Sequence, residues 1–514
     1  MTRPLRWSLL SALLVLLTLS PVSADEFDAL REKIPKELTA RGVPSIAVAV
    51  ARDGKIIWEQ GFGWADREKR VEATEHTMYS LASISKPIAA TGLAILCQQG
   101  KIDLDKPIDD YLGAAKVTAR VGSAADATVR RVANHTAGLP LHYQFFYEDE
   151  PYRRPAMDET IRRYANLVTA PGERFQYSNL GYGLIDYIIA RQSGRPFVDY
   201  MREEVFLPLG LTRMSVDIGP GLEKFAAVRY GTDGLPIPFY DFDHPGGSAV
   251  FASAHDLARF GMFHAGSKLP DQREILNDEW RTKMQEPTAD IERGRRYGVG
   301  WFLQDDKQGR RVVSHSGGMG GVSTLLSIVP EQKVVVVVLS NSSSPLPGQL
   351  SAEILETVLA KPATEKPATE KTAEPAAEKP KSEKDEAAEA LVSGKPPEDH
   401  GLKPLVGRWK GTVHTYERDL PIELWFQEDG DVHVKFEGQL ATLLTGARVR
   451  DGWLRGRLHA DLGIVDVNRT KHELHLEVKQ RGDVLNGSLI AMSVRVPRVG
   501  NALTHWIEVK KQAE

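Results

Sequence analysis

Hydrophobic residues are spaced along this chain in two different ways, on either side of a segment that has almost none. Between residues 361 and 400 large apolar side chains nearly vanish, and the sequence of Lys361–Glu365 repeats at once as Lys366–Glu370. Burial in this segment cannot offset the entropy of ordering it, so we expect an extended Pro/Lys/Glu-rich linker. The linker is predicted to separate a large region, 25–360, from a small one, 401–514.

The large region is predicted to build one antiparallel sheet from strands at both of its ends. Ile46–Ala51 and Lys55–Trp58 flank an Asp53-Gly54 turn, which is typical of a hairpin. Near the other end, Lys333–Leu339 contains five consecutive valines, which indicates a strand buried on both faces. Leu325–Val329 precedes that strand across a short turn. The sequence therefore predicts a sheet closed by segments that are distant along the chain.

Helical patterns fill the interval between these strands. Ile88–Gln98 and Leu180–Arg191 have helical spacing, and Ser351–Ala360 is predicted to form a final helix. The small region instead alternates apolar and polar residues, as in Val432–Phe436 and Val484–Ala491, with Asp-Gly turns nearby. We therefore predict an α/β (α+β) fold with a helical subdomain, followed by a small all-β barrel or sandwich.

The first residues are typical of a secretory signal. Arg3 and Arg6 precede an apolar run from Trp7 to Leu19, and a small-residue site ends at Ala24. The run is shorter than the ~20 residues that span a bilayer. We predict a signal peptide over 1–24, a periplasmic or secreted protein, and no stable membrane span after cleavage.

Composition removes several classes of function. The 514 residues carry a net charge of −4, which gives no basic surface for nucleic acid. One cysteine, Cys97, excludes a disulfide framework and a cysteine-built metal cage. His244 lies near Asp241 and Asp243, but Pro245 and two glycines follow it, so we interpret this stretch as a loop. We expect neither a cofactor nor a metal.

The segment with the most chemical information contains Ser83 and Lys86. On a helix beginning near Ser83 these residues share one face, and Pro87 falls in the first turn, where proline is tolerated. The helix that follows is apolar on every side and must be buried. Burial and the helix N-terminus both disfavour the ammonium form of Lys86. Its amine is therefore predicted to be a base that activates Ser83 as a nucleophile.

Two further segments carry polar groups at the edge of predicted elements. Tyr177 and Asn179 precede the second helix, where a hydroxyl can relay a proton and a carboxamide can hold a substrate amide. His315, Ser316, Gly317 and Gly318 follow the strand pattern that ends at Ser314. Glycines there allow a substrate backbone to approach, and an exposed amide can stabilise an oxyanion.

Taken in order, these three segments resemble the serine β-lactamase and penicillin-binding-protein superfamily. The resemblance covers residues 28 to 345 and is strongest to class C β-lactamases, D-alanyl-D-alanine carboxypeptidases and family VIII esterases. It implies a β-lactamase/transpeptidase-like fold. In the small region, Gly407-Arg408-Trp409 is similar to the start of the lipocalin-like barrels that follow such domains. A barrel that packs without a ligand is the alternative.

The resemblance also implies a role for each residue. Ser83 is the acylated nucleophile, and Lys86, alone or paired with Tyr177, is the base. Tyr177 protonates the leaving group, and Asn179 orients the substrate. The backbone amides of Ser83 and Gly318 form the oxyanion hole.

One residue departs from the family pattern. His315 stands where β-lactamases and penicillin-binding proteins usually carry a lysine that holds a substrate carboxylate. A histidine is mostly neutral near pH 7. We therefore expect a serine hydrolase with small ester, amide or D-amino-acid peptide substrates. A β-lactamase or D-alanyl-D-alanine carboxypeptidase is one alternative, and a non-catalytic cell-wall or lipid binding protein is another.

Overall fold

The structure is a computed structural model that describes residues 26–360, 400–494 and 498–513. The predicted signal peptide over 1–24 lies outside the described residues, as does the predicted linker apart from its last residue. Both stay predictions. In the described ranges no helix is long and apolar enough to cross a membrane.

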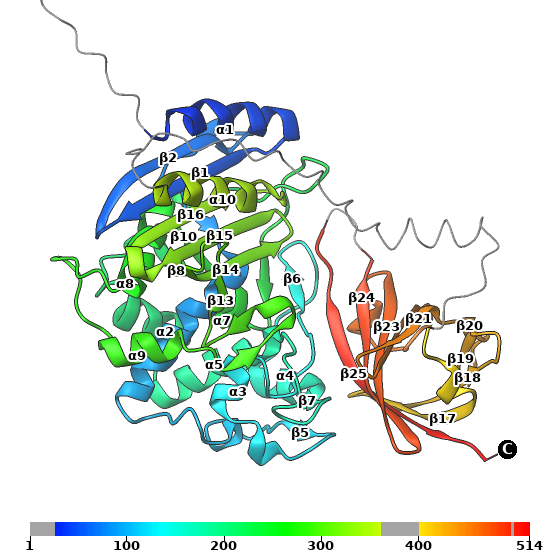
Figure 1. Ribbon diagram of the computed structural model, residues 1–514. Helices are drawn as coiled ribbons and strands as arrows, with labels where there is room; N and C mark the ends of the chain where they lie inside the picture. Colours follow the sequence, from blue (N-terminus) through cyan, green and yellow to red (C-terminus); the bar gives the residue numbers. More distant parts are fainter. Residues whose placement is uncertain (1–25, 361–399, 495–497, 514) are drawn as a thin grey trace, which may run out of the picture.

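A nine-stranded antiparallel sheet forms the upper layer of the large region (Figure 1). In pairing order its strands are β11 (Ala289–Asp290), β12 (Arg296–Tyr297), β13 (Phe302–Asp305), β14 (Arg311–Met319), β15 (Val322–Val329), β16 (Val334–Ser340), β1 (Ser45–Arg52), β2 (Lys55–Asp66) and β3 (Val71–Glu72). β1 lies between its hairpin partner β2 and the distant β16. This confirms the predicted closure of the sheet by strands from both ends of the region.

Helices bury both faces of this sheet. On one face α1 (Asp28–Arg41) and α10 (Leu346–Leu359) pack against Val336 and Val338. On the other, α8 (Ala254–His264) covers Val335 and Val337. All five valines of β16 are buried, as predicted, and each contributes about 1.5–3 kcal/mol by leaving water. α10 begins five residues before the predicted start at Ser351, because prolines are tolerated in a first helical turn.

A helical layer fills the lower part of the large region (Figure 1). Its helices are α2 (Ser85–Gln98), α3 (Val129–Ala133), α4 (Met157–Tyr164), α5 (Asn179–Ser193), α6 (Phe197–Met201), α7 (Pro245–Ser248) and α9 (Asp278–Met284). Short strand pairs complete it: β4 (Tyr79–Ser80) and β8 (Met214–Val216) flank β10 (Val250–Ala252), β5 (Thr118–Ala119) pairs with β7 (Asn166–Leu167), and β6 (Phe145–Tyr147) with β9 (Tyr240–Phe242). The predicted helices over 88–98 and 180–191 correspond to α2 and α5.

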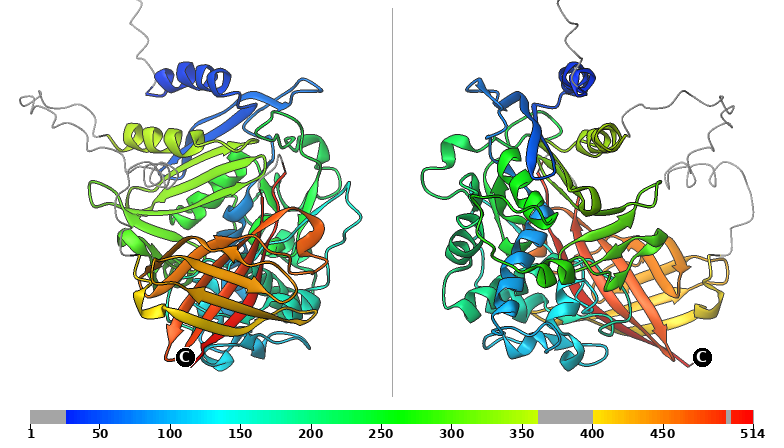
Figure 2. Two further views of the ribbon diagram at one scale, coloured as in Figure 1. Left: turned by 90° about the vertical axis from the view of Figure 1, so that its right-hand side faces the viewer. Right: turned by 60° about the vertical axis from the view of Figure 1, so that its left-hand side comes forward.

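The C-terminal region is a nearly closed barrel of nine strands, which the two views of Figure 2 show from different sides. In pairing order they are β20 (Thr442–Leu443), β19 (Val432–Phe436), β18 (Asp419–Phe426), β17 (Gly407–His414), β25 (Ala502–Lys511), β24 (Val484–Ser493), β23 (His472–Arg481), β22 (Trp453–Leu458) and β21 (Thr445–Arg450). Side chains such as Trp409, Leu424 and Leu476 are buried in its core. The predicted all-β architecture is confirmed.

The barrel packs against the helical layer through ion pairs in which Asp466 is buried and the other charged side chains are partly buried. Asp466 accepts hydrogen bonds from the Tyr164 hydroxyl at 2.8 Å and from Arg163 at 2.9 Å. Glu477, on β23, accepts from Arg174 at 2.8 Å. Breaking a buried pair leaves an uncompensated charge and is strongly destabilising. These contacts therefore hold the barrel beside α4 (Figure 1).

Two adjacent glycines of β14 differ in the space around them, which gives a test of the packing. A Cβ at Gly317 would lie 2.0 Å from the Leu81 carbonyl oxygen, whereas one at Gly318 would meet no atom within 4 Å. We expect Gly317→Ala to lower the free energy of unfolding by about 1–3 kcal/mol, because β14 must move away from Leu81. Gly318→Ala, the matched control, retains wild-type stability. Denaturant unfolding measures both, and equal stability of the two variants would contradict the packing.

Candidate active site

Ser83 is presented at the start of a helix that is buried on every side. It lies in a single 3₁₀ turn, Ala82–Ile84, and the α-helix α2 begins at Ser85, two residues later than predicted. Ala82 has φ +49°, a left-handed conformation that is uncommon for a residue with a side chain and often occurs at functional sites. The strained turn and the buried helix together fix the position of the Ser83 hydroxyl.

The Lys86 amine has three oxygen partners and no carboxylate among the described residues. Its Nζ lies 3.2 Å from Ser83 Oγ, 2.7 Å from Asn179 Oδ1 and 3.0 Å from the Gly247 carbonyl oxygen. Burial lowers the pKa of Lys86 well below its ordinary value of 10.5. A neutral amine donates two hydrogens to the two carbonyl oxygens and directs its lone pair to the Ser83 hydroxyl. The geometry therefore suits proton transfer from Ser83 to Lys86.

Tyr177 lies on the other side of this pair, just before α5. Its ring centre is 4.8 Å from Lys86 Nζ, and its hydroxyl is close enough to Ser83 for that side chain to lower the Tyr177 pKa in part. Burial raises the pKa of Tyr177 above its ordinary value, although the Ser83 contact lowers it in part. The phenol is therefore protonated near neutral pH. Ser178 caps α5 by accepting a hydrogen bond from the Gly181 amide, which places Asn179 at the first turn, facing Lys86.

The third predicted segment lies inside a strand. The pattern predicted a strand ending at Ser314, but β14 continues to Met319, because residues 315–319 pair with β15. His315 is buried, its Nε2 is 3.0 Å from the Tyr297 hydroxyl, and its Nδ1 is 2.7 Å from the Ser316 carbonyl oxygen. Burial and then Lys86 lower the pKa of His315 to about 3, so the ring is neutral.

A cavity of about 530 Å³ opens in front of Ser83. Of the predicted site residues, Ser83, Asn179 and Gly318 line it. Lys86 and Tyr177 are in contact with Ser83, whereas the His315 ring is directed to Tyr297. Ser316 is exposed, and Gly317 packs against the Leu81 carbonyl. The structure thus brings five predicted residues together around the cavity, namely Ser83, Lys86, Tyr177, Asn179 and Gly318. The His315 side chain contacts Tyr297 instead of these residues.

Several residues around the cavity were not among the sequence-based candidates. Tyr297 contacts His315, and the His135 ring stacks 4.4 Å from Tyr177 while its Nδ1 accepts a hydrogen bond from the Ser178 amide. His135 and Tyr297 lie in two further stretches whose sequences are similar to the family, 134–140 and 297–301, and this similarity was the signal for them. His244 and Ser248 also line the cavity. Ser248 lies in Gly246-Gly247-Ser248, a stretch that is also similar to the family, and His244 was considered only as a metal ligand.

The barrel supplies part of the cavity wall. Met492, Ser493, Arg498, Val499 and Gly500, next to or within the connection between β24 and β25, line the same cavity as Ser83. Tyr143 and Phe145 of the large region complete this side. The site is therefore composed of residues from both ends of the chain.

Comparison with known proteins agrees with this architecture. Penicillin-binding protein 4* of Bacillus subtilis is 27% identical over 57% of this chain and 67% of its own length. The chain spans about two thirds of the length of such bacterial relatives, or slightly less.

Two solved structures share the fold. The octameric penicillin-binding protein homologue from Pyrococcus abyssi has a TM-score of 0.55 at 22% identity, over 93% of this chain and 99% of that one. The beta-lactamase/D-alanine carboxypeptidase from Pseudomonas syringae has a TM-score of 0.56 at 20% identity, over 66% of this chain and all of that one (100%). Residues 30–361 match the Beta-lactamase family model, and the chain therefore belongs to this family of β-lactamase and penicillin-binding-protein-like serine hydrolases.

Proposed function

We propose that this protein is an exported serine hydrolase that forms an acyl-enzyme on Ser83 and acts on small ester, amide or D-amino-acid peptide substrates. One observation carries the proposal: the buried Lys86 amine, without a carboxylate partner among the described residues, lies 3.2 Å from Ser83 Oγ. A buried lysine with a lowered pKa beside a serine is the arrangement that nucleophilic catalysis needs.

The proposed chemistry assigns one step to each group. Ser83 Oγ attacks the substrate carbonyl carbon while its proton passes to Lys86 Nζ. The amides of Ser83 and Gly318 stabilise the oxyanion, and the Tyr177 hydroxyl gives its proton to the leaving group and regains one from Lys86. The acyl–leaving-group bond breaks, and Ser83 holds the acyl group. Water then releases the acid and restores Ser83.

The polarity of the cavity supports uncharged acyl groups as substrates. Among the described lining residues Arg498 is the charged one, and Asp149 binds its guanidinium through two hydrogen bonds of 2.8 and 2.5 Å. The neutral His315 supplies no positive charge either. No free cation of the described lining is therefore available to hold a substrate carboxylate, which favours esters and amides over β-lactams.

A β-lactamase or D-alanyl-D-alanine carboxypeptidase activity is the second candidate. It is favoured by the names of a relative, a penicillin-binding protein, and of a structural neighbour, a beta-lactamase/D-alanine carboxypeptidase. Rapid turnover of a chromogenic cephalosporin at low enzyme concentration would favour this activity, whereas turnover of esters alone would favour the first. The contacts among Ser83, Lys86 and Tyr177 weigh against a protein that only binds ligands, since binding needs no activated nucleophile.

We also propose the division of the chain that the sequence suggests. Residues 1–24 are a signal peptide, 25–360 the hydrolase domain, 361–400 a linker and 401–514 a lipocalin-like β domain. The described elements of the large region end at α10, and those of the small region begin with a 3₁₀ turn, Lys403–Leu405, followed by β17, which supports two folded units.

Removal of the nucleophile tests the proposed function directly. Ser83→Ala is expected to lower ester hydrolysis by about 10⁴-fold or more and to abolish labelling by fluorophosphonate and penicillin probes, because no hydroxyl remains to be acylated. Ser80→Ala is the matched control, since the buried Ser80 hydroxyl has no hydrogen-bond partner among the described residues. Intact-mass spectrometry and initial rates measure both effects. Wild-type labelling of Ser83→Ala would disprove the assignment.

The pH dependence of acylation tests the state of Lys86. The neutral amine is the base, so kcat/KM for an uncharged ester is expected to rise with pH as Lys86 loses its proton. Because burial lowers the pKa of Lys86, this rise is complete well below pH 10.5. A rate profile from pH 5 to 10 measures it. A tenfold increase for each pH unit between 8 and 10 would contradict a neutral Lys86.

A further inference from the structure

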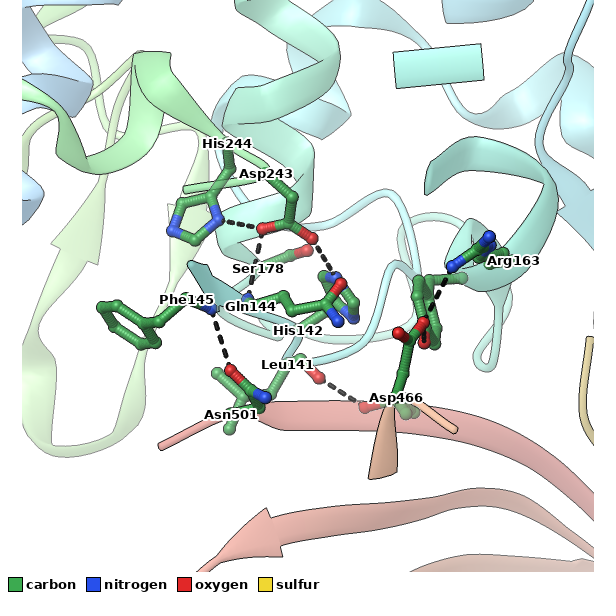
Figure 3. A network of polar contacts seen from close by, with 12 residues as sticks. Leu141, His142, Gln144, Phe145, Arg163, Ser178, Asp243, His244, Asp466 and Asn501 are labelled. Carbon is green, nitrogen blue, oxygen red and sulfur yellow. Dashed lines mark hydrogen bonds and ion pairs between the residues drawn. The ribbon is translucent and has the colours of Figure 1, made fainter. Parts of the chain in front are cut away.

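A second chain of hydrogen bonds ends at the cavity that contains Ser83. Asp243 Oδ1 is 2.5 Å from His244 Nδ1, and His244 Nε2 is 3.1 Å from Ser248 Oγ (Figure 3 shows the first of these contacts). His244 and Ser248 line the cavity together with Ser83 and Asn179. A carboxylate, an imidazole and a serine hydroxyl in this order form the arrangement that activates a hydroxyl in many hydrolases.

The Asp243 carboxylate, at one end of this series of hydrogen bonds, is held in place by several neighbours. His142 Nε2 lies 2.5 Å from Asp243 Oδ2, and the Gln144 amide donates to Oδ1 at 3.2 Å (Figure 3). The side chains of His142 and Asp243 are fully buried. Burial raises the pKa of Asp243, but His142 and His244 outweigh this and lower it below its ordinary value. Asp243 is therefore ionised near neutral pH and accepts the Nδ1 hydrogen of His244.

This contact fixes the proton on the imidazole. With Nδ1–H donated to Asp243, the lone pair of His244 Nε2 is directed to the Ser248 hydroxyl. Burial lowers the pKa of His244, although Asp243 raises it in part, and Lys86 and His142 add to the lowering. The neutral ring is able to accept the Ser248 proton. The oxygen of Ser248 then has a free lone pair for a water in the cavity.

The barrel binds the segment that contacts Asp243. Tyr143 and Ala502 exchange two backbone hydrogen bonds of 3.0 and 2.9 Å, and the Phe145 amide donates to Asn501 Oδ1 at 2.8 Å (Figure 3 shows the latter). The segment held in this way, residues 141–145, contacts Asp243 through the His142 ring and the Gln144 backbone amide (Figure 3). Exclusion of bulk water strengthens electrostatic interactions inside the site.

We propose that Ser248, His244 and Asp243 form a proton relay that activates the water for deacylation of Ser83. This inference rests on the proposed function. The water oxygen bonds to the acyl carbon while its proton passes to Ser248 Oγ and the Ser248 proton passes to His244 Nε2. Asp243 stabilises the imidazolium. As the bond between Ser83 Oγ and the acyl carbon breaks, the proton returns through Ser248 to Ser83, and the free acid leaves.

In this proposal Lys86 and Tyr177 act in acylation, whereas Ser248, His244 and Asp243 act in deacylation. Lys86 and Tyr177 both contact Ser83 itself and serve acylation. The raised pKa of Tyr177 disfavours the phenolate that would accept a proton from water. The Nε2 of His244 is an acceptor that faces the Ser248 hydroxyl, so His244 fits the second step. General-base assistance of this kind contributes about 10²–10⁴-fold to a rate.

Pre-steady-state kinetics of the full chain with a p-nitrophenyl ester tests the relay. Ser248→Ala and His244→Gln are expected to retain the acylation burst within about twofold, while the steady-state rate falls by about 10²-fold. Acyl-Ser83 then accumulates in the intact-mass spectrum and maps to the Ser83 peptide. Ser248→Thr keeps the hydroxyl and restores turnover, and hydroxylamine, a nucleophile that needs no base, restores turnover of Ser248→Ala.

Matched controls separate the relay from a loss of packing. Ser351→Ala removes a buried hydroxyl of α10, and His264→Gln removes a buried imidazole of α8 that contacts Thr91. Both are expected to keep the wild-type deacylation rate. If these two controls deacylate at the wild-type rate while Ser248→Ala deacylates slowly, the result supports the relay.

Three results would overturn the relay. They are an unchanged deacylation rate in Ser248→Ala and His244→Gln, an equal loss of burst and steady-state rates, and an acyl group mapped to Ser248. Failure of the proposed function gives a different result: the unaltered protein forms no acyl-enzyme on Ser83 with any acylating substrate. In that case the relay is overturned as well.

Discussion

The burial of one amine determines the chemistry of this site. Lys86 lies on α2, whose residues from Ser85 to Cys97 are all buried, and no carboxylate of the described chain compensates its charge. An unpaired ammonium in such a place costs several kcal/mol, so burial lowers the pKa of Lys86 well below its ordinary value and favours the neutral amine. The sheet and the helical layer must close around α2 for this to hold. The environment of Lys86 and Ser83, on which the proposed acylation rests, thus depends on the packing of the whole large region.

The same principle extends to the imidazoles near Ser83. His315 and His244 are both buried, burial lowers the pKa of each, and each contacts a hydroxyl through Nε2. Their partners differ: His315 is fixed by a neutral backbone carbonyl, whereas His244 is fixed by the Asp243 carboxylate. A carboxylate stabilises an imidazolium and a carbonyl does so far less. This difference is the physical basis for assigning proton transfer to His244 and a structural contact to His315.

The barrel contributes to the site although it begins beyond the segment that matches the family model, which ends at residue 361. Its β25 pairs with Tyr143, and residues 498–500 complete the cavity wall. Ion pairs of Asp466 and Glu477 hold it there. Small changes in the connection between β24 and β25 alter the wall of the cavity without altering Ser83 or Lys86. The barrel thus shapes part of the cavity in front of Ser83.

The sequence by itself determined the features that depend on neighbours along the chain. The five valines of β16 and the hairpin of β1 and β2 are local patterns, and both occur in the structure as predicted. Ser83 and Lys86 are in contact as expected from their spacing, although Ser83 lies in a 3₁₀ turn before the helix. Only the tertiary structure decided what these elements meet. Phe145 and Asn501 are 356 residues apart and share a hydrogen bond, and the inward direction of His315 depends on Tyr297. The periodicity of apolar residues indicates which face of a helix or strand is buried, but it does not indicate which element packs against that face. Contacts between distant segments depend on how the whole chain folds.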